Sequence, residues 1–243
     1  MQYQWKSMSM PAKLQIAKGR DTAKIYKQIV ELYNKIDQDF SMYRPDSLIN
    51  KYNQGLIELT DYPELKFILN ECDRTKKETA GYFDIETSGV KDPTGLVKGY
   101  AISQAAKLLH DNGYHDFLVE IAGDIQTSGV SDTKEPWAIG IENPFALGEI
   151  IKVVHLSGEG IATSGTSIHK DHIINPHTKK ATSEIASLSI IARDVYDADR
   201  YATAAFAMGQ KGIEWVSKIP SLAGYMITLD HQGVMTNHFK HYV

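Results

Sequence analysis

The stretch Asp92-Pro93-Thr94-Gly95-Leu96-Val97-Lys98-Gly99-Tyr100-Ala101 lies near the middle of the chain and leads into a run with helical spacing. It places two glycines, an acid and a lysine within ten residues. Glycines let a backbone come close to a ligand, and a helix N-terminus offers free N–H groups and a partial positive charge. Two interpretations stay open from these residues alone: a loop that faces a phosphate group, or a turn whose lysine is solvated.

Outward from this stretch, apolar spacing predicts the secondary structure. Helices are expected at residues 22–40, 48–53, 63–80, 99–109, 197–208 and 212–219. Strands are expected at residues 5–17, 116–121, 137–141, 150–156, 188–192, 225–229 and 234–238, with an irregular segment at 81–94 and a loop region at 158–176. Because strands and helices do not alternate regularly, we predict an α+β fold with mixed or antiparallel sheets and packed helices. We expect residues 1–243 to form a single globular domain.

Composition narrows the function classes. The 243 residues carry 26 Lys and Arg against 30 Asp and Glu, a net charge of −4, which gives no basic stripe for nucleic acid. The single cysteine, Cys72, excludes an intramolecular disulfide and a cysteine-rich metal site. No apolar run approaches the roughly 20 residues of a membrane span, and residues 1–18 lack the apolar core of a signal peptide. We therefore expect a cytoplasmic protein, although a chain with its leader removed would look the same.

A predicted helix places Asp199 and Thr203 four residues apart, on one face, among alanines. Their two oxygen ligands suit Mg²⁺, which keeps few protein ligands and completes its shell with water and phosphate oxygens. The alternative is a solvent-facing aspartate and a threonine bonded to its own helix.

The segment 169–177 holds three histidines, but it lacks a helical HExxH spacing and Pro176 prevents a long helix. His172 is a candidate for phosphate binding or proton transfer rather than for a zinc site. Further candidate side chains sit in loops, where acids and hydroxyls often serve a site rather than the core. They are Tyr43, Asp84, Asp92, Asp124 and the Thr163-Ser164-Gly165 turn.

In order along the chain, these pieces resemble the motifs of the ApbE-type FAD:protein FMN transferases. The matching segments are Met10-Pro11-Ala12, Ser41-Met42-Tyr43 with Pro45-Asp46-Ser47 and Asn53, Thr79-Ala80-Gly81-Tyr82-Phe83-Asp84, Asp92 to Ala101, Ala122-Gly123-Asp124, Ala162-Thr163-Ser164-Gly165, His172-Ile173-Ile174-Asn175-Pro176, and Asp199-Arg200-Tyr201-Ala202-Thr203. Each piece is weak, but the ordered set is specific.

The resemblance implies a fold of the ApbE type, similar to a T-fold, and a reaction in which the FMN half of FAD passes to a Thr or Ser hydroxyl of an acceptor flavoprotein with release of AMP. It implies that Mg²⁺ is held by Gly95, Asp199 and Thr203. It assigns catalysis to His172, Lys98 and Asp199. The residues implied to contact FAD are Met10, Tyr43, Phe83, Asp84, Asp92, Lys98, Thr163, Ser164 and His172.

The chain departs from the family pattern at several positions. Only seven residues separate Asp84 from Asp92, where the family usually carries a long insertion. Pro11-Ala12 stands for Gly-Thr, Thr94 and Ala122 each replace a glycine, and Asn175 replaces an aspartate. These changes predict a compact branch with an intact metal and phosphate centre and a remodelled flavin rim.

Two other functions fit the same residues. A magnesium-dependent FAD pyrophosphatase would pass FMN to water, and a non-catalytic flavin-binding protein would keep a vestigial site. The metal ligands and Lys98 favour an enzyme, because a protein that only held flavin would not need them. We expect FAD and an acceptor protein as partners, no nucleic acid and no membrane span, and a homodimer remains open.

Overall fold

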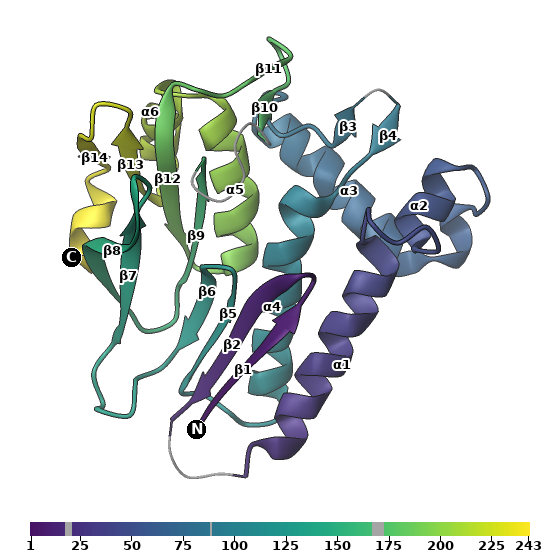
Figure 1. The fold of residues 1–243 in the computed structure, drawn as a ribbon. Coiled ribbons are helices and arrows are strands. Elements are labelled where there is room, and N and C mark those ends of the chain that lie inside the picture. Colours follow the sequence, from purple (N-terminus) through teal and green to yellow (C-terminus); the bar gives the residue numbers. More distant parts are fainter. Residues whose placement is uncertain (18–20, 88, 167–172) are drawn as a thin grey trace.

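The computed structural model describes residues 1–17, 21–87, 89–166 and 173–243 (Figure 1). Its helical elements are α1 (Ala23–Phe40), α2 (Leu48–Asn53), η1 (Leu59–Asp61), α3 (Pro63–Glu78), α4 (Thr94–Asp111), α5 (Val195–Ala207), α6 (Lys211–Ser217) and η2 (His238–Tyr242). Its strands are β1 (Gln2–Ser7), β2 (Met10–Ile16), β3 (Glu86–Thr87), β4 (Val90–Lys91), β5 (Phe117–Ile121), β6 (Asp124–Ser128), β7 (Trp137–Asn143), β8 (Ala146–Leu156), β9 (Gly160–Gly165), β10 (Ile174–Asn175), β11 (Lys180–Ala181), β12 (Ile185–Ala192), β13 (Ala223–Thr228) and β14 (Gly233–Met235).

Most strands of the described residues join one eight-stranded sheet with the order β1-β2-β5-β6-β9-β12-β13-β14. Every neighbouring pair in it is antiparallel. The β7–β8 hairpin pairs only with itself among the described residues. This arrangement confirms the predicted α+β class with antiparallel sheets.

Both faces of the sheet are buried, and the strand period of two divides the side chains between them. On β5, Phe117 and Val119 belong to a core shared with α1, α3 and α4, whereas Leu118 faces the core under the β7–β8 hairpin. On β12, Ile190 packs against α5 and α6, whereas Ile191 turns to the hairpin side. The helices therefore cover one face, and the hairpin with η2 covers part of the other (Figure 1).

Helix α4 extends further than the sequence predicted, because it begins at Thr94 rather than at residue 99. Pro93 stands at its N-cap position, and the Asp92 carboxylate accepts a hydrogen bond from the Thr94 backbone N–H at 3.0 Å. Proline and a local acid both favour a helix start. Gly95 and Lys98 consequently lie inside the first turns of the helix and not in a loop before it.

Four other predictions of local structure were wrong. Residues 5–17 form the β1–β2 hairpin rather than one strand, because Met8 and Ser9 turn the chain with positive φ angles. The predicted loop at 158–176 contains β9. Strand β6, which begins at Asp124, was not predicted. Residues 81–94 include the small β3–β4 hairpin.

Within the described residues, no helix is long and apolar enough to cross a lipid bilayer.

Candidate active site

The sheet parts between β6 and β9, and a cleft opens at that point. These strands pair through Ile125 with Ile161 and Gln126 with Gly160, while β9 continues beyond them beside β12. The cleft has a volume of about 1440 Å³. Its walls come from β2, the segment 82–86, the first turns of α4, the β5–β6 turn, β7, β9 and α5.

Helices α4 and α5 approach each other closely at the floor of this cleft. A Cβ atom added at Gly99 would lie 2.7 Å from the Asp199 Cβ and 3.0 Å from the Val195 carbonyl oxygen, so only glycine fits. The Gly99 backbone N–H donates a hydrogen bond of 2.7 Å to Asp199 Oδ2. Two helices from distant parts of the sequence thereby fix one buried carboxylate at the cleft.

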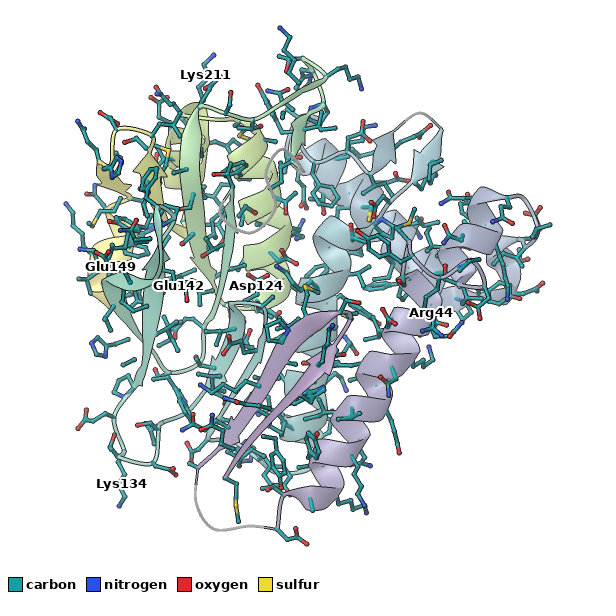
Figure 2. All side chains as sticks on the ribbon, in the orientation of Figure 1. Arg44, Asp124, Lys134, Glu142, Glu149 and Lys211 are labelled. Carbon is teal, nitrogen blue, oxygen red and sulfur yellow. The ribbon has the colours of Figure 1, made fainter. Side chains whose placement is uncertain are left out.

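A charged cluster of Lys98, Asp124 and Asp199 surrounds this point, and Figure 2 labels Asp124 near the centre of the molecule. Lys98 Nζ lies 2.7 Å from Asp124 Oδ2, and the Lys98 side chain is 22% exposed whereas that of Asp124 is 1% exposed. Asp124 Oδ1 accepts a hydrogen bond from the Thr163 backbone N–H at 3.1 Å, which joins the cluster to β9. Two carboxylates thus share one ammonium group.

Burial and the neighbouring charges shift the pKa values of Asp199 and Lys98. Burial raises the pKa of the Asp199 carboxyl group, Lys98 opposes that rise, and the Asp124 carboxylate adds to it. Burial alone would lower the pKa of Lys98, but attraction to Asp124 and Asp199 outweighs burial and raises it. The lysine therefore stays charged at neutral pH and compensates one carboxylate, which leaves the second carboxyl group to a proton or another cation.

The β5–β6 turn delivers Asp124 to the cluster. Ala122 and Gly123 have φ angles of 48° and 89°, the two positive values that a tight type I′ hairpin turn needs. Alanine is an uncommon choice at such an angle. The turn nevertheless forms, and it places Asp124, the first residue of β6, beside Lys98 near the start of α4.

The predicted metal residues come together at the same place. Gly95, Asp199 and Thr203 all line the cleft. The Thr203 hydroxyl lies 3.5 Å from the Gly95 carbonyl oxygen, and the Thr203 methyl group is 3.4 Å from where a Cβ of residue 95 would stand. A Cβ atom at residue 95 would therefore stand in van der Waals contact with Thr203.

The oxygen atoms of Gly95, Asp199 and Thr203 fit Mg²⁺ as ligands. A carbonyl, a hydroxyl and a carboxylate supply the hard oxygen ligands that this ion prefers, and few protein ligands suffice because water and phosphate oxygens complete the shell. The uncompensated carboxylate of the cluster would gain from a bound cation. No group of three or more His, Cys, Asp or Glu able to hold a metal occurs among the residues that the structure describes.

Most of the predicted flavin contacts also reach the cleft. Met10, Phe83, Asp84, Asp92, Lys98, Thr163 and Ser164 line it. The Asp84 carboxylate pairs with Lys76 at 2.8 Å; burial would raise its pKa, but the Lys76 partner and the Glu86 N–H lower it. The Thr163 and Ser189 hydroxyls lie 2.7 Å apart, which fixes the Thr163 side chain.

Two predicted contacts stand apart from this group. Tyr43 is 93% exposed and does not line the cleft, so the structure does not bring its ring to the other candidate residues. Its contact with flavin stays a prediction. His172 lies outside the described residues.

The sequence missed part of the cleft wall. Residues 138–142 of β7 line it along five consecutive positions, as do Lys13 and Glu120 from neighbouring strands β2 and β5. The sequence indicates Asp124 as a candidate acid in a loop, but it does not predict the pairing of Asp124 with Lys98. No local signal reveals these contacts, because each depends on how distant strands come together.

The protein thus has an α+β fold with a large cleft. Oxygen atoms of Gly95, Asp199 and Thr203 and the first turns of α4 lie together in its wall. The sequence model of the ApbE family matches residues 8–92 and 89–226. The chain therefore belongs to the ApbE family. The two matched parts meet at the short segment that follows Asp84.

Curated proteins that are similar to this chain carry the name FAD:protein FMN transferase. One from Klebsiella pneumoniae, named FAD:protein FMN transferase, is 28% identical over 60% of this chain and 44% of its own length. One of the same name from Chlamydia muridarum is 24% identical over 79% of each chain. The chain spans about half the length of most of the curated relatives it matches.

Solved structures share the fold. The flavin transferase ApbE from Vibrio cholerae has a TM-score of 0.86 at 19% identity and covers 100% of this chain and 99% of its own. The ApbE protein from Thermotoga maritima has a TM-score of 0.85 at 21% identity, with 100% and 98% covered. At these identities the likeness concerns the fold.

Proposed function

We propose that this protein transfers the FMN moiety of FAD to a Thr or Ser hydroxyl of an acceptor protein, with Mg²⁺ and with release of AMP. The observation that carries the proposal is the Lys98, Asp124 and Asp199 cluster beside Gly95 and Thr203 in a cleft of about 1440 Å³. Family membership and the printed name of the curated relatives support it. A cleft of this size exceeds the common range for drug-sized ligands, in keeping with a dinucleotide.

The start of α4 suits the pyrophosphate of the substrate. Thr94 and Gly95 line the cleft in the first turn of the helix, where the partial positive charge of the helix dipole favours an anion. Lys98 stands one turn further, and its ammonium group would balance negative charge that grows on the phosphate oxygens. Asp124 holds that ammonium group in place at 2.7 Å.

The metal would be held by the Gly95 carbonyl oxygen, the Asp199 carboxylate and the Thr203 hydroxyl. When bound, Mg²⁺ would neutralise phosphate charge as a Lewis acid. Asp199 is fixed for this role by the Gly99 N–H, which occupies its Oδ2 atom.

The reaction exchanges one phosphorus–oxygen bond for another. The acceptor hydroxyl oxygen forms a bond to the phosphorus of the FMN half, the bond from that phosphorus to the bridging oxygen breaks, and AMP leaves with the bridging oxygen. The hydroxyl proton passes to a base, and His172 is the proposed base or phosphate ligand. Met10, Phe83, Asp84, Asp92, Thr163 and Ser164 are the proposed contacts to the rest of FAD, and Tyr43 is a further proposed contact.

Incubation with FAD, Mg²⁺ and a candidate acceptor flavoprotein tests the proposal. Transfer predicts AMP release together with flavin that stays on the acceptor after denaturation, measured by its mass. Free FMN and AMP in equal amounts, with no labelled acceptor, would indicate the pyrophosphatase instead, because the same cluster could activate attack by water. Bound FAD without any AMP would contradict both and favour a flavin-binding protein. A cytoplasmic location and a homodimer also remain predictions.

A further inference from the structure

Two histidine side chains meet at the end of α4 that lies away from the cleft. His110 belongs to the last turn of the helix, and His115 precedes β5. Their Nδ1 atoms lie 3.4 Å apart, and both side chains are exposed. The 15 residues between Gly95 and His110 correspond to about 22 Å of helix, so this pair is separate from the proposed active site.

The pair is a poor hydrogen bond. Protein hydrogen bonds usually span about 2.7–3.2 Å between heavy atoms, and 3.4 Å is longer. The spacing matches that of two ligand atoms on one metal ion. Two nitrogens at about 2.0–2.1 Å from one tetrahedral zinc ion stand roughly 3.3–3.4 Å apart, because the tetrahedral angle sets their separation.

The surroundings hold the His110 ring and the backbone at His115 in place. His110 packs edge-on against the Phe117 ring, with ring centres 5.0 Å apart. The His115 carbonyl oxygen accepts a hydrogen bond of 2.6 Å from Ser128 Oγ, and the next residue, Asp116, accepts one of 2.9 Å from the Val130 N–H. The His110 side chain therefore needs little ordering when an ion binds.

Local charge also favours a cation. The end of a helix carries partial negative charge, which stabilises positive groups nearby. Lys107, one turn before His110, is paired with Asp111 at 2.7 Å, so its charge is balanced. Asp116 follows His115 directly in the sequence and adds a negative charge close by.

We propose that His110 and His115 form a surface site for a divalent transition-metal ion of the zinc type, bound through both Nδ1 atoms and completed by water. Imidazole ligands suit zinc, copper and nickel and discriminate against Mg²⁺. The ion would join the end of α4 to the start of β5. This site does not depend on the proposed transferase activity.

Titration with Zn²⁺ in excess Mg²⁺ tests the site, because Mg²⁺ competes for oxygen ligands anywhere on the protein but poorly for imidazole nitrogens. Calorimetry should give one Zn²⁺ per chain, and nitrogen-15 spectra of the imidazoles should show the Nδ1 signals of His110 and His115 shifting together. His115→Gln should weaken the affinity about 100-fold, since it removes one arm of the chelate. His155→Gln, at an exposed histidine on β8, is the matched control and should bind as the wild type does.

Equal affinity for the wild type and His115→Gln would overturn the proposal. So would an equal loss in the His155→Gln control, or Nδ1 signals of the two histidines that titrate at separate Zn²⁺ concentrations. Circular dichroism of each variant shows whether it is folded. AMP release from FAD should be the same for His115→Gln and the wild type, which separates this test from that of the catalytic function.

Discussion

Consecutive residues on α5 enter two different buried charge clusters. Asp199 turns to the cleft, where two carboxylates share the ammonium group of Lys98. Arg200 is 3% exposed and turns to α3, where it bonds to Thr75 and Glu78, and it also bonds to Asp197 and Tyr201 of its own helix. It does not line the cleft.

Each cluster has two acids for one cation, and the difference lies in where those acids stand. The side chains of Glu78 and Asp197 are 37% and 41% exposed, and every hydrogen-bond partner of Arg200 is an acid or a hydroxyl, so that cluster is closed and joins α3 to α5. Asp124 and Asp199 are buried beside a single ammonium group, and the Asp199 cluster opens onto space that a ligand can enter. Adjacent positions can therefore serve structure and chemistry separately, and substitutions should separate them.

The largest expected effect comes from Asp199→Asn. The amide can still accept the Gly99 N–H but lacks the charge that would hold Mg²⁺, so we expect AMP release from FAD to fall by about 1000-fold. Its thermal stability without metal should equal or exceed that of the wild type, because one of two crowded carboxylates is gone. A variant with wild-type turnover would remove the metal assignment.

Arg200→Met should show the opposite pattern. Loss of the guanidinium removes a donor to the Thr75 hydroxyl and leaves Glu78 and Asp197 without their shared cation, so we expect the free energy of unfolding to drop by about 3 kcal/mol. The Mg²⁺ concentration for half-maximal activity should not change at a temperature where the variant is folded. Urea denaturation and metal titration measure the two quantities, and a shifted metal dependence would show that the clusters are coupled.

Gly99→Ala should lower both stability and turnover, because it acts on the contact between α4 and α5. The added methyl group would meet Asp199 and the Val195 carbonyl, and we expect a loss of about 2 kcal/mol in stability. Displacement of Asp199 should also reduce turnover roughly tenfold. A neutral result in both assays would show that the helices can separate without consequence.

Much of this arrangement follows from the sequence. Spacings of three and four predicted α1, and its buried residues Ile25, Ile29, Ile36 and Phe40 confirm the stripe. Strands β6 and β9 were missed because their sequences, Asp124–Ser128 and Gly160–Gly165, are rich in polar and small residues that are typical of loops. Their burial comes from the sheet around them, which no local pattern contains.

The candidate site shows the same limit. The Asp199 and Thr203 pair could be found because both residues lie on one helix at a fixed spacing. The link from Lys98 to Asp124 could not, because it joins α4 to a strand through the β5–β6 turn. Tyr43 was predicted from its motif, yet the structure exposes it.

The smallest expected effect concerns pH and the closed cluster. Burial would raise the pKa of Glu78, but hydrogen bonds from Arg200 and Tyr201 outweigh it and lower the pKa. A lowered pKa stabilises the folded state above the unfolded value, and that stability is lost as the pH falls through the folded value. We expect Glu78→Gln to remove this acid sensitivity, by less than about 1 kcal/mol because the side chain is partly exposed. Denaturation curves at acidic and neutral pH would measure it, and an unchanged acid dependence would contradict the assignment.

The central claim is that the open cluster directs a metal-dependent cleavage of FAD. The most direct test measures AMP release from FAD by the wild-type protein as Mg²⁺ is added and then removed with a chelator. We predict that AMP forms only when Mg²⁺ is present, and that the rate returns when the ion is restored. AMP release at the same rate in the presence of the chelator, or intact FAD at saturating Mg²⁺ with and without acceptor proteins, would contradict the account.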